Sequence, residues 1–244
     1  MVGQISLAQS NPVIAHRGAW KKQSLPQNSI ASLKEAIRLG CAATEFDVHL
    51  TKDDILVVNH DNTFQGIEIA TATYEELLAL SLSNGEKIPT AEAFLREGMR
   101  QKETKLVFEL KSSPLGEERT KDAAFYAVDL VKRMGVEEYV EYILFSYEGA
   151  KKIIELDPTA KVSYLLGDVA PQQVKKDGFY GIDYHFRIFR ENPTWIEEAK
   201  RLGLVVNVWT VNTAEEMQHL LDQQVDFITT DEPELLFELI KQRL

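Results

Sequence analysis

Three carboxylates stand in two short, largely apolar segments of this sequence. Glu45 and Asp47 are two residues apart in ATEFDVHL, and Glu109 lies in LVFELKSS. Side chains two residues apart in a strand point to the same face, so Glu45 and Asp47 are expected to project together. Converging carboxylates repel one another, and a divalent cation that prefers oxygen ligands relieves the repulsion. The pattern favours a site for Mg²⁺ or Ca²⁺, with Mn²⁺ also allowed, and the alternative is pairing with buried Lys or Arg.

Two histidines close short β-rich segments of the chain. His16 ends VIAH and is followed by Arg17, and His60 ends LVVNH. Cleavage of a phosphodiester needs one group that takes a proton from the nucleophile and another that protonates the leaving alkoxide, and two histidines can do this near neutral pH. The sequence does not decide which of them is the base, and either one alone could be structural. Arg17 and Lys111 would add local positive charge for a phosphate group.

The elements that carry these residues must bring them together. Short β-rich runs alternate with segments of helical period, which is typical of βα units around a parallel sheet. Eight such pairs in 244 residues predict a single (β/α)8 TIM barrel over residues 1–244, since these barrels have about 250 residues. The expected strands are residues 12–16, 43–48, 105–111, 142–146, 161–166, 181–186, 204–211 and 226–231. The expected helices are residues 29–39, 90–100, 118–134, 147–156, 171–176, 193–202, 213–221 and 233–243.

One stretch, at about residues 50–89, interrupts the alternation between the second strand and the second helix. Within it, residues 55–59 are expected to form a short strand and residues 73–80 a short helix. Long loops that follow the strands of such a barrel crown the face that carries the active site. We therefore predict a small insertion beside the site.

The motifs around these residues resemble, in content and order, those of the glycerophosphodiester phosphodiesterase family over nearly the whole chain. They are AHRG at 15–18, PQNS at 26–29, EFDVHLTKDD at 45–54, VVNHD at 57–61, FELK at 108–111, VWTVN at 208–212 and DFITTDEP at 226–233. The resemblance implies a role for each candidate residue: metal ligation by Glu45, Asp47 and Glu109, acid and base roles for His16 and His60, and phosphate contact by Arg17 and Lys111.

The resemblance also implies a reaction. A free glycerol hydroxyl would attack the adjacent phosphorus and release the alcohol, which gives a cyclic phosphate. Water would then open this cyclic phosphate to glycerol 3-phosphate. Trp209 would pack against the substrate or simply belong to the core. The clearest departure is PQNS, where the family usually has Glu, Asn and Thr. Gln27 removes a negative charge near the metal but can still accept a hydrogen bond from Arg17.

Two other functions stay open. The same barrel and metal set resembles the sphingomyelinase D group, but the modest apolar content of residues 65–83 does not favour a choline-lipid substrate. A barrel that binds phosphate esters without turnover is also conceivable, because Gln27 is unusual. Retention of both histidines, all three acids and both basic residues argues against it.

Composition restricts the partners. A net charge of -11, from 38 acidic and 27 basic residues, opposes nucleic acid or an anionic membrane surface as a partner and leaves a small-molecule substrate. A lone Cys41 excludes an intrachain disulfide. Residues 1–11 lack the pattern of a signal peptide and no apolar run approaches a membrane span, so we expect a soluble protein, either cytoplasmic or periplasmic. Protein partners are not indicated.

Other polar residues near strand ends are expected to have lesser parts. His49 is expected just beyond the end of the second strand, and His219 in a helix, with both structural or exposed. One of Tyr184 and His185, at the end of the sixth strand, is expected to line the pocket. Asp231 ends the last strand and is expected to cap the final helix.

Overall fold

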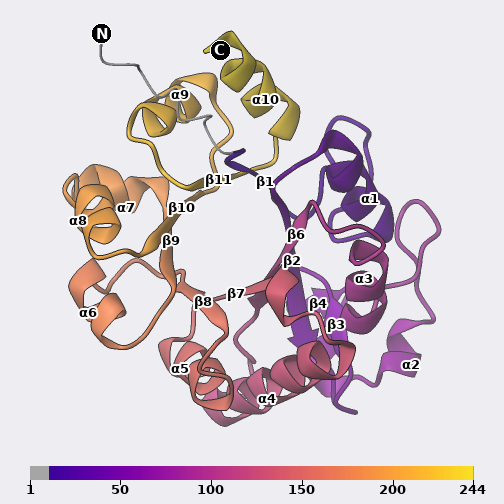
Figure 1. The fold of residues 1–244 in the computed structure, drawn as a ribbon. Helices are drawn as coiled ribbons and strands as arrows, with labels where there is room; N and C mark the ends of the chain where they lie inside the picture. Colours follow the sequence, from indigo (N-terminus) through magenta and orange to yellow (C-terminus); the bar gives the residue numbers. More distant parts are fainter. Residues whose placement is uncertain (1–10, 244) are drawn as a thin grey trace, which may run out of the picture.

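The computed structural model describes residues 11–243, which form a closed barrel of parallel strands ringed by helices (Figure 1). Strand β1 pairs with both β2 and β11, and this pairing closes the barrel. The predicted (β/α)8 barrel is confirmed. Residues 1–10, on most of which the expected lack of a signal peptide rests, lie outside the described residues. The barrel strands are β1 (Val13–Ala15), β2 (Ala43–Leu50), β6 (Lys105–Leu110), β7 (Val140–Leu144), β8 (Lys161–Tyr164), β9 (Gly181–His185), β10 (Val205–Trp209) and β11 (Phe227–Thr230).

The helices pack around the outside of the barrel. The eight expected helices are present, with bounds that shift by at most a few residues, and α7, which directly follows β9, was not expected. None of the helices within residues 11–243 is long and apolar enough to cross a membrane. The helices around the barrel are α1 (Ile30–Leu39), α3 (Ala91–Gly98), α4 (Glu117–Met134), α5 (Tyr147–Leu156), α6 (Pro171–Lys176), α7 (Phe186–Glu191), α8 (Trp195–Arg201), α9 (Ala214–Asp222) and α10 (Pro233–Gln242). A short 3-10 helix, η2 (Glu137–Tyr139), precedes β7.

Local sequence signals account for several helix bounds. Ser29 and Ser32 form a capping box at the start of α1, in which each hydroxyl accepts a hydrogen bond from the backbone N–H of the other residue. Gly40 ends this helix at φ 75°, a left-handed conformation that glycine adopts without a steric cost. Pro171 begins α6, where its missing N–H is no loss. Such signals can be read without any tertiary contact.

Alternation along the strands separates two cores. Outward-facing residues pack under the helices; Phe46 of β2, for example, stacks on Phe94 of α3 with ring centroids 4.5 Å apart. A smaller cluster inside the barrel includes Ala43 of β2 and Val107 of β6. Glu45, Asp47 and Glu109 share the inward parity of these two residues, so the barrel itself directs the three acids into its interior.

The insertion between β2 and α3 forms a small unit of its own. Its elements are β3 (Leu56–Val58), β4 (Thr63–Phe64), β5 (Ile67–Glu68), η1 (Ile69–Thr71) and α2 (Tyr74–Leu77). Val57, Phe64, Ile69, Ala72, Leu77 and Ile88 make a separate buried cluster within it. The expected strand and helix are both present in shorter form, whereas the β4–β5 hairpin was not expected.

The insertion corrects one prediction. Strand β3 pairs antiparallel with the end of β2, with Val48 opposite Val58 and Leu50 opposite Leu56. This pairing extends β2 to Leu50, so the expectation that His49 lies beyond the strand end is wrong. His49 is buried within β2, on the same inward parity as the acids.

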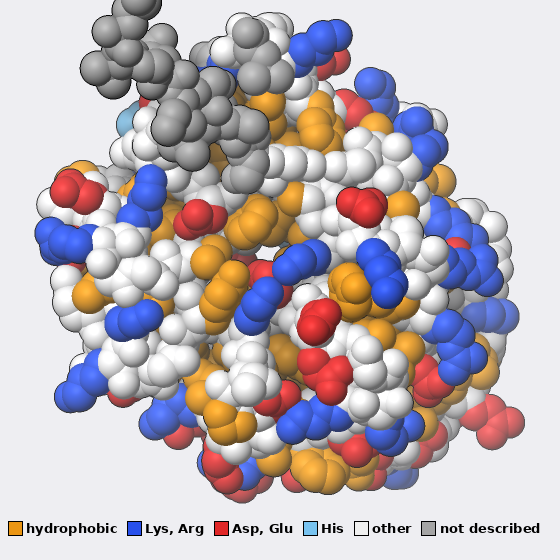
Figure 2. Space-filling model, viewed as in Figure 1, with side chains coloured by type: hydrophobic (Ala, Val, Ile, Leu, Met, Phe, Trp, Pro, Cys, Tyr) orange, Lys and Arg blue, Asp and Glu red, His pale blue; other side chains and the backbone are white. Residues whose placement is uncertain are grey.

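The surface carries both signs of charge. On the face seen in Figure 2, basic and acidic side chains are interspersed with hydrophobic ones around a central hollow, which lies over the barrel axis in this view. The two signs are mixed over this face, so the excess of acidic residues is not gathered there into one patch.

Candidate active site

The three acids meet on the inward faces of the neighbouring strands β2 and β6. These strands are paired in parallel with Asp47 opposite Glu109. One carboxylate oxygen from each of Glu45, Asp47 and Glu109 lies within 4.8 Å of the others. All three side chains are buried, and Oε1 of Glu45 has no hydrogen-bond partner among residues 11–243. Buried oxygens this close together, one of them unpaired, fit a shared divalent cation.

The charges at this cluster are not balanced by the protein alone. Burial, and then the charges of Asp47 and Glu109, raise the pKa of Glu45 well above its ordinary value. Burial followed by the charge of Asp47 raises the pKa of Glu109 to about 7. Burial acts in the same sense on Asp47, but nearby cations outweigh it and hold the pKa of Asp47 below its usual range. The cation with the largest effect on Asp47 is Lys111, whose Nζ lies 3.1 Å from Oδ1 of Asp47 and 2.7 Å from Oε1 of Glu109.

These shifts predict that the metal-free protein loses stability as the pH rises from about 6.5 to about 8. A carboxyl with a raised folded pKa stabilises the fold below its unfolded pKa, and the effect is lost as the pH rises through the folded value. That value is about 7 for Glu109 and about 8 for the buried carboxyl of Asp183. Burial lowers the pKa of His49 to about 4, so this residue has the opposite effect: it adds stability as the pH rises. That gain is complete above the ordinary histidine pKa of 6.5, so it does not mask the loss at higher pH.

The measurement is the melting temperature in EDTA across this pH range. Glu109→Gln is the matched control, since it removes one titrating group and should flatten the slope. A melting temperature that rose over the same range would contradict the prediction.

Arg17 reaches the cluster through both its backbone and its side chain. Its backbone N–H donates to Oε2 of Glu45 at 2.9 Å, and its guanidinium Nε lies 3.5 Å from Oδ2 of Asp47. Nη1 of the same side chain donates to Oε1 of Gln27 at 2.7 Å. Gln27 therefore accepts from Arg17, which the sequence analysis allowed, and holds the guanidinium beside the acids with a neutral group.

The loops around Arg17 adopt uncommon backbone conformations. Arg17 and Asn28 have φ values of 56° and 58°, which cost free energy for residues other than glycine. Gly18 has φ 82°, and a Cβ there would lie 2.3 Å from the Ser32 hydroxyl of α1, so only glycine fits. Both ends of the Asn28 amide are hydrogen-bonded to Asp47. Nδ2 of Asn28 donates to Oδ2 of Asp47 at 2.8 Å, and Oδ1 of Asn28 accepts from the backbone N–H of Asp47 at 3.1 Å. Asn28 thus orders the loop.

His16 is oriented by a carboxylate from the far end of the chain. Its Nδ1 lies 2.7 Å from Oδ1 of Asp231, which also accepts from the indole N–H of Trp20 at 3.3 Å. Nε2 of His16 is left on the side of Glu45, 4.0 Å from Oε2. The expected capping role of Asp231 is wrong, because Glu232 is the N-cap residue of α10.

His60 enters the cavity from the insertion. Its Nδ1 lies 2.7 Å from Oδ1 of Asp61, and burial lowers its pKa. His49 supports it from below, since its Nε2–H donates to the carbonyl oxygen of His60 at 3.2 Å. Both His16 and His60 therefore engage a carboxylate through Nδ1, which leaves Nε2 of each ring for proton exchange.

One small cavity of about 90 Å³ joins these groups. Of the residues singled out in the sequence, His16, Arg17, Glu45, His60, Glu109, Lys111 and Trp209 line it, and Asp47 lies directly behind them. Trp209 donates its indole N–H to the carbonyl oxygen of Asp183 at 2.8 Å and packs edge-on against Phe145. The expectation that Tyr184 or His185 lines the pocket is wrong: Tyr184 faces the outer core, and His185 accepts a hydrogen bond at the start of α7.

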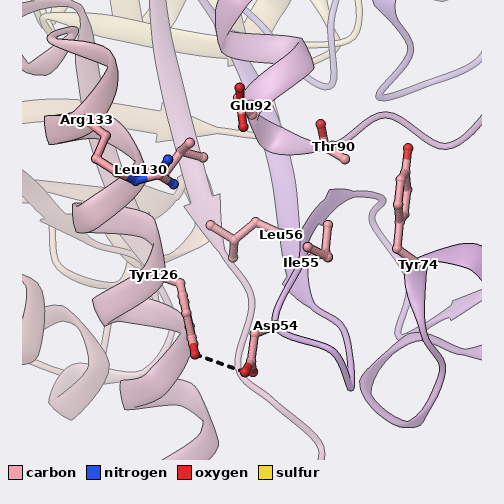
Figure 3. A pocket seen from close by; sticks show the side chains of 9 residues that line it. All are labelled: Asp54, Ile55, Leu56, Tyr74, Thr90, Glu92, Tyr126, Leu130 and Arg133. Atoms are coloured by element: carbon pink, nitrogen blue, oxygen red, sulfur yellow. Dashed lines mark hydrogen bonds between the residues drawn. The ribbon is translucent and has the colours of Figure 1, made fainter.

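A larger groove of about 260 Å³ lies between the insertion and α4 (Figure 3). Its lining residues include no histidine. Asp54 is already engaged there, accepting from the hydroxyl of Tyr126 at 2.9 Å and pairing with Arg119 at 2.7 Å. The smaller cavity is therefore the one with groups available for chemistry.

A barrel of this kind, with paired imidazoles and basic groups around a carboxylate cluster, is the framework of an enzyme that cleaves phosphoric diesters. A model of the glycerophosphoryl diester phosphodiesterase family matches residues 16–235. The chain belongs to this family, and the resemblance inferred from the seven motifs is confirmed.

Individual relatives agree over nearly their full length. The chain is 31% identical to a glycerophosphodiester phosphodiesterase of Caldanaerobacter subterraneus, over 94% of this chain and 98% of the relative. A crystal structure of a glycerophosphodiester phosphodiesterase from Parabacteroides distasonis has a TM-score of 0.93 and 46% identity, with 95% of this chain and 97% of that chain covered. An Oleispira antarctica phosphodiesterase solved with the product sn-glycerol-3-phosphate shares the fold, with a TM-score of 0.82, 23% identity and coverage of 94% and 96%.

Proposed function

We propose that this phosphodiesterase hydrolyses glycerophosphodiesters to glycerol 3-phosphate and an alcohol in a reaction that requires a divalent cation. The observation that carries the proposal is one cavity lined by His16, His60 and the acids of β2 and β6, with Lys111 beside them. The product bound by the Oleispira enzyme, which has the same fold, supports glycerol 3-phosphate as the product here.

Glu45, Asp47 and Glu109 would hold the cation, for which Mg²⁺ or Ca²⁺ is the proposed identity because all the ligands are hard oxygens. When bound, such an ion supplies Lewis-acid stabilisation of the negative charge that grows on the phosphoryl oxygens. Lys111 and Arg17 contribute further positive charge, one as an ammonium and the other as a planar fork. Both are held by the same acids, so they lie where a phosphate group beside the acids would need them.

The two histidines move the protons. In the first step Nε2 of one histidine, which is neutral, accepts the proton of the glycerol hydroxyl that attacks phosphorus. The other histidine, which is protonated, donates a proton to the leaving alkoxide. In the second step the roles reverse, as water opens the cyclic phosphate. Asp231 keeps Nδ1 of His16 occupied and Asp61 does the same for His60, so each ring presents its other nitrogen. Trp209 would contact the substrate on the side of the cavity that faces the acids.

The test is an assay of glycerol 3-phosphate release from glycerophosphocholine and glycerophosphoethanolamine, with Mg²⁺, Ca²⁺, Mn²⁺ or EDTA. We expect release with at least one of the cations and loss of it in EDTA. Release that persists in EDTA would sink the metal requirement. Cleavage of sphingomyelin in place of both diesters would point instead to a sphingomyelinase D-like enzyme, and binding of glycerol 3-phosphate without turnover to a non-catalytic barrel.

A further inference from the structure

A fourth carboxyl lines the active-site cavity without belonging to the acid cluster. Asp183 of β9 is 1% exposed and is among the lining residues. The closely spaced group of acids comprises Glu45, Asp47 and Glu109 and does not include it. In the barrel order, β9 is separated from β2 and β6 by several strands on either side, so Asp183 approaches the cavity from the opposite wall.

The carboxyl of Asp183 is incompletely paired. Its Oδ1 is buried and has no hydrogen-bond partner within residues 11–243. Asn207 lies opposite it on β10. One N–H of the Asn207 amide donates to Thr229, and the other is the only side-chain donor that acts on the Asp183 carboxyl, where it partly offsets the rise in pKa. No basic side chain of the described part of the chain pairs with Asp183. A buried polar atom left unpaired costs about 1–3 kcal/mol.

The surroundings favour the neutral acid over a carboxylate. The neighbouring lining residues Ile143, Phe145, Leu165 and Trp209 are largely apolar. Burial raises the pKa of Asp183 to about 8, so the group carries an O–H donor as well as a carbonyl acceptor near neutral pH. A carboxyl with both functions, in an apolar wall, is suited to an uncharged hydroxyl.

We propose that Asp183 is a specificity-determining residue that hydrogen-bonds the terminal hydroxyl of the substrate's glycerol group. The inference rests on the proposed function. The phosphate and the attacking hydroxyl must lie against the acids and histidines on the β2 and β6 side, which leaves the remaining hydroxyl of glycerol to face β9. Trp209 holds that wall in place, because its indole N–H is bonded to the backbone carbonyl of Asp183.

The experiment compares two substrates. One is glycerophosphoethanolamine, and the other is the phosphoethanolamine diester of propane-1,2-diol, which keeps the attacking hydroxyl and lacks the terminal one. We expect the wild type to prefer the glycerol diester by about 10- to 100-fold in kcat/KM, since an unmet buried partner costs about that much. Asp183→Ala should bring the ratio to within about threefold of unity, and Asp183→Asn, which keeps a donor and an acceptor, should retain most of the preference.

The controls separate this role from a structural one. Asp157→Ala removes a carboxyl that is 9% exposed and pairs with Lys132 outside the cavity, and it should keep the wild-type ratio. If Asp183→Ala does not fold, Asp183→Leu fills the space without a polar group and should abolish the preference in the same way. A ratio that survives in either variant, or a wild type without preference, overturns the proposal.

The proposed function can fail separately. If the wild type cleaves neither diester, the function is wrong, and the Asp183 inference is then judged by calorimetry on the purified protein. Glycerol 3-phosphate should bind more tightly than the phosphate of propane-1,2-diol, and Asp183→Ala should remove the difference. Equal binding of the two phosphates by the wild type would overturn the inference.

Discussion

Replacing His16 with alanine is expected to lower kcat by about 100- to 10,000-fold with little change in KM, since this is the usual cost of losing a general acid or base. The ring is oriented for proton transfer, with Nδ1 engaged by Asp231 and Nε2 on the side of Glu45. The side chain is mostly buried at the cavity, so its removal also leaves a space that water can enter. Steady-state kinetics on glycerophosphoethanolamine at saturating divalent cation make the measurement.

Two companion variants give that result its meaning. Asp231→Asn keeps the imidazole but replaces the carboxylate that orients it, and a loss of about 10- to 100-fold is expected, as is typical for such supporting partners. His219→Ala changes a histidine on α9, outside the cavity lining, and should leave kcat unchanged. Full activity in His16→Ala would remove this residue from the proton-transfer scheme.

Neutralising one acid of the cluster is expected to abolish both cation binding and turnover. Glu45→Gln replaces a proposed metal ligand whose Oε1 is otherwise unpaired among the described residues, so a loss in kcat of about 1,000-fold or more is expected. The wild type should gain thermal stability on addition of Mg²⁺, Ca²⁺ or Mn²⁺, because a ligand that binds only the folded state stabilises it. The variant should gain little.

The same substitution has an opposite effect without metal. Burial and the charges of Asp47 and Glu109 disfavour an ionised Glu45, so Glu45→Gln should melt at a higher temperature than the wild type in EDTA near pH 8. Glu141→Gln is the matched control, since Glu141 belongs to the same barrel on β7 but pairs with Lys105 and Lys161 away from the cavity. If Glu45→Gln kept the cation-induced gain, the cluster would not be the metal site.

The framework of the barrel could be predicted because its signals are local. Helices α5 and α6 have the bounds expected from the sequence, with Ser146 and Pro171 at their starts. Helix α7 was missed because its six residues follow β9 without an intervening loop and are too few to show a helical period. The two-residue strands β4 and β5 were missed for the same reason, since they are too short to alternate.

The amino-acid sequence by itself determined which residues share a face. The two-residue period of a strand puts Glu45 beside Asp47 and Glu109 beside Lys111, and the motif order that revealed the family is also a property of the chain alone. These statements need no knowledge of which strands are neighbours.

Only the tertiary structure decided what those faces meet. Asp231 reaches His16, 215 residues away, because closure of the barrel pairs β11 with β1, and Asp183 lies opposite Asn207 because β9 pairs with β10 in that register. His60 reaches the cavity because β3 pairs with β2. The same pairing places His49 of β2 where it can hydrogen-bond the carbonyl oxygen of His60. Local periodicity specifies a direction for each side chain, whereas strand order, register and closure specify its neighbours, and the latter arise only when the whole barrel forms.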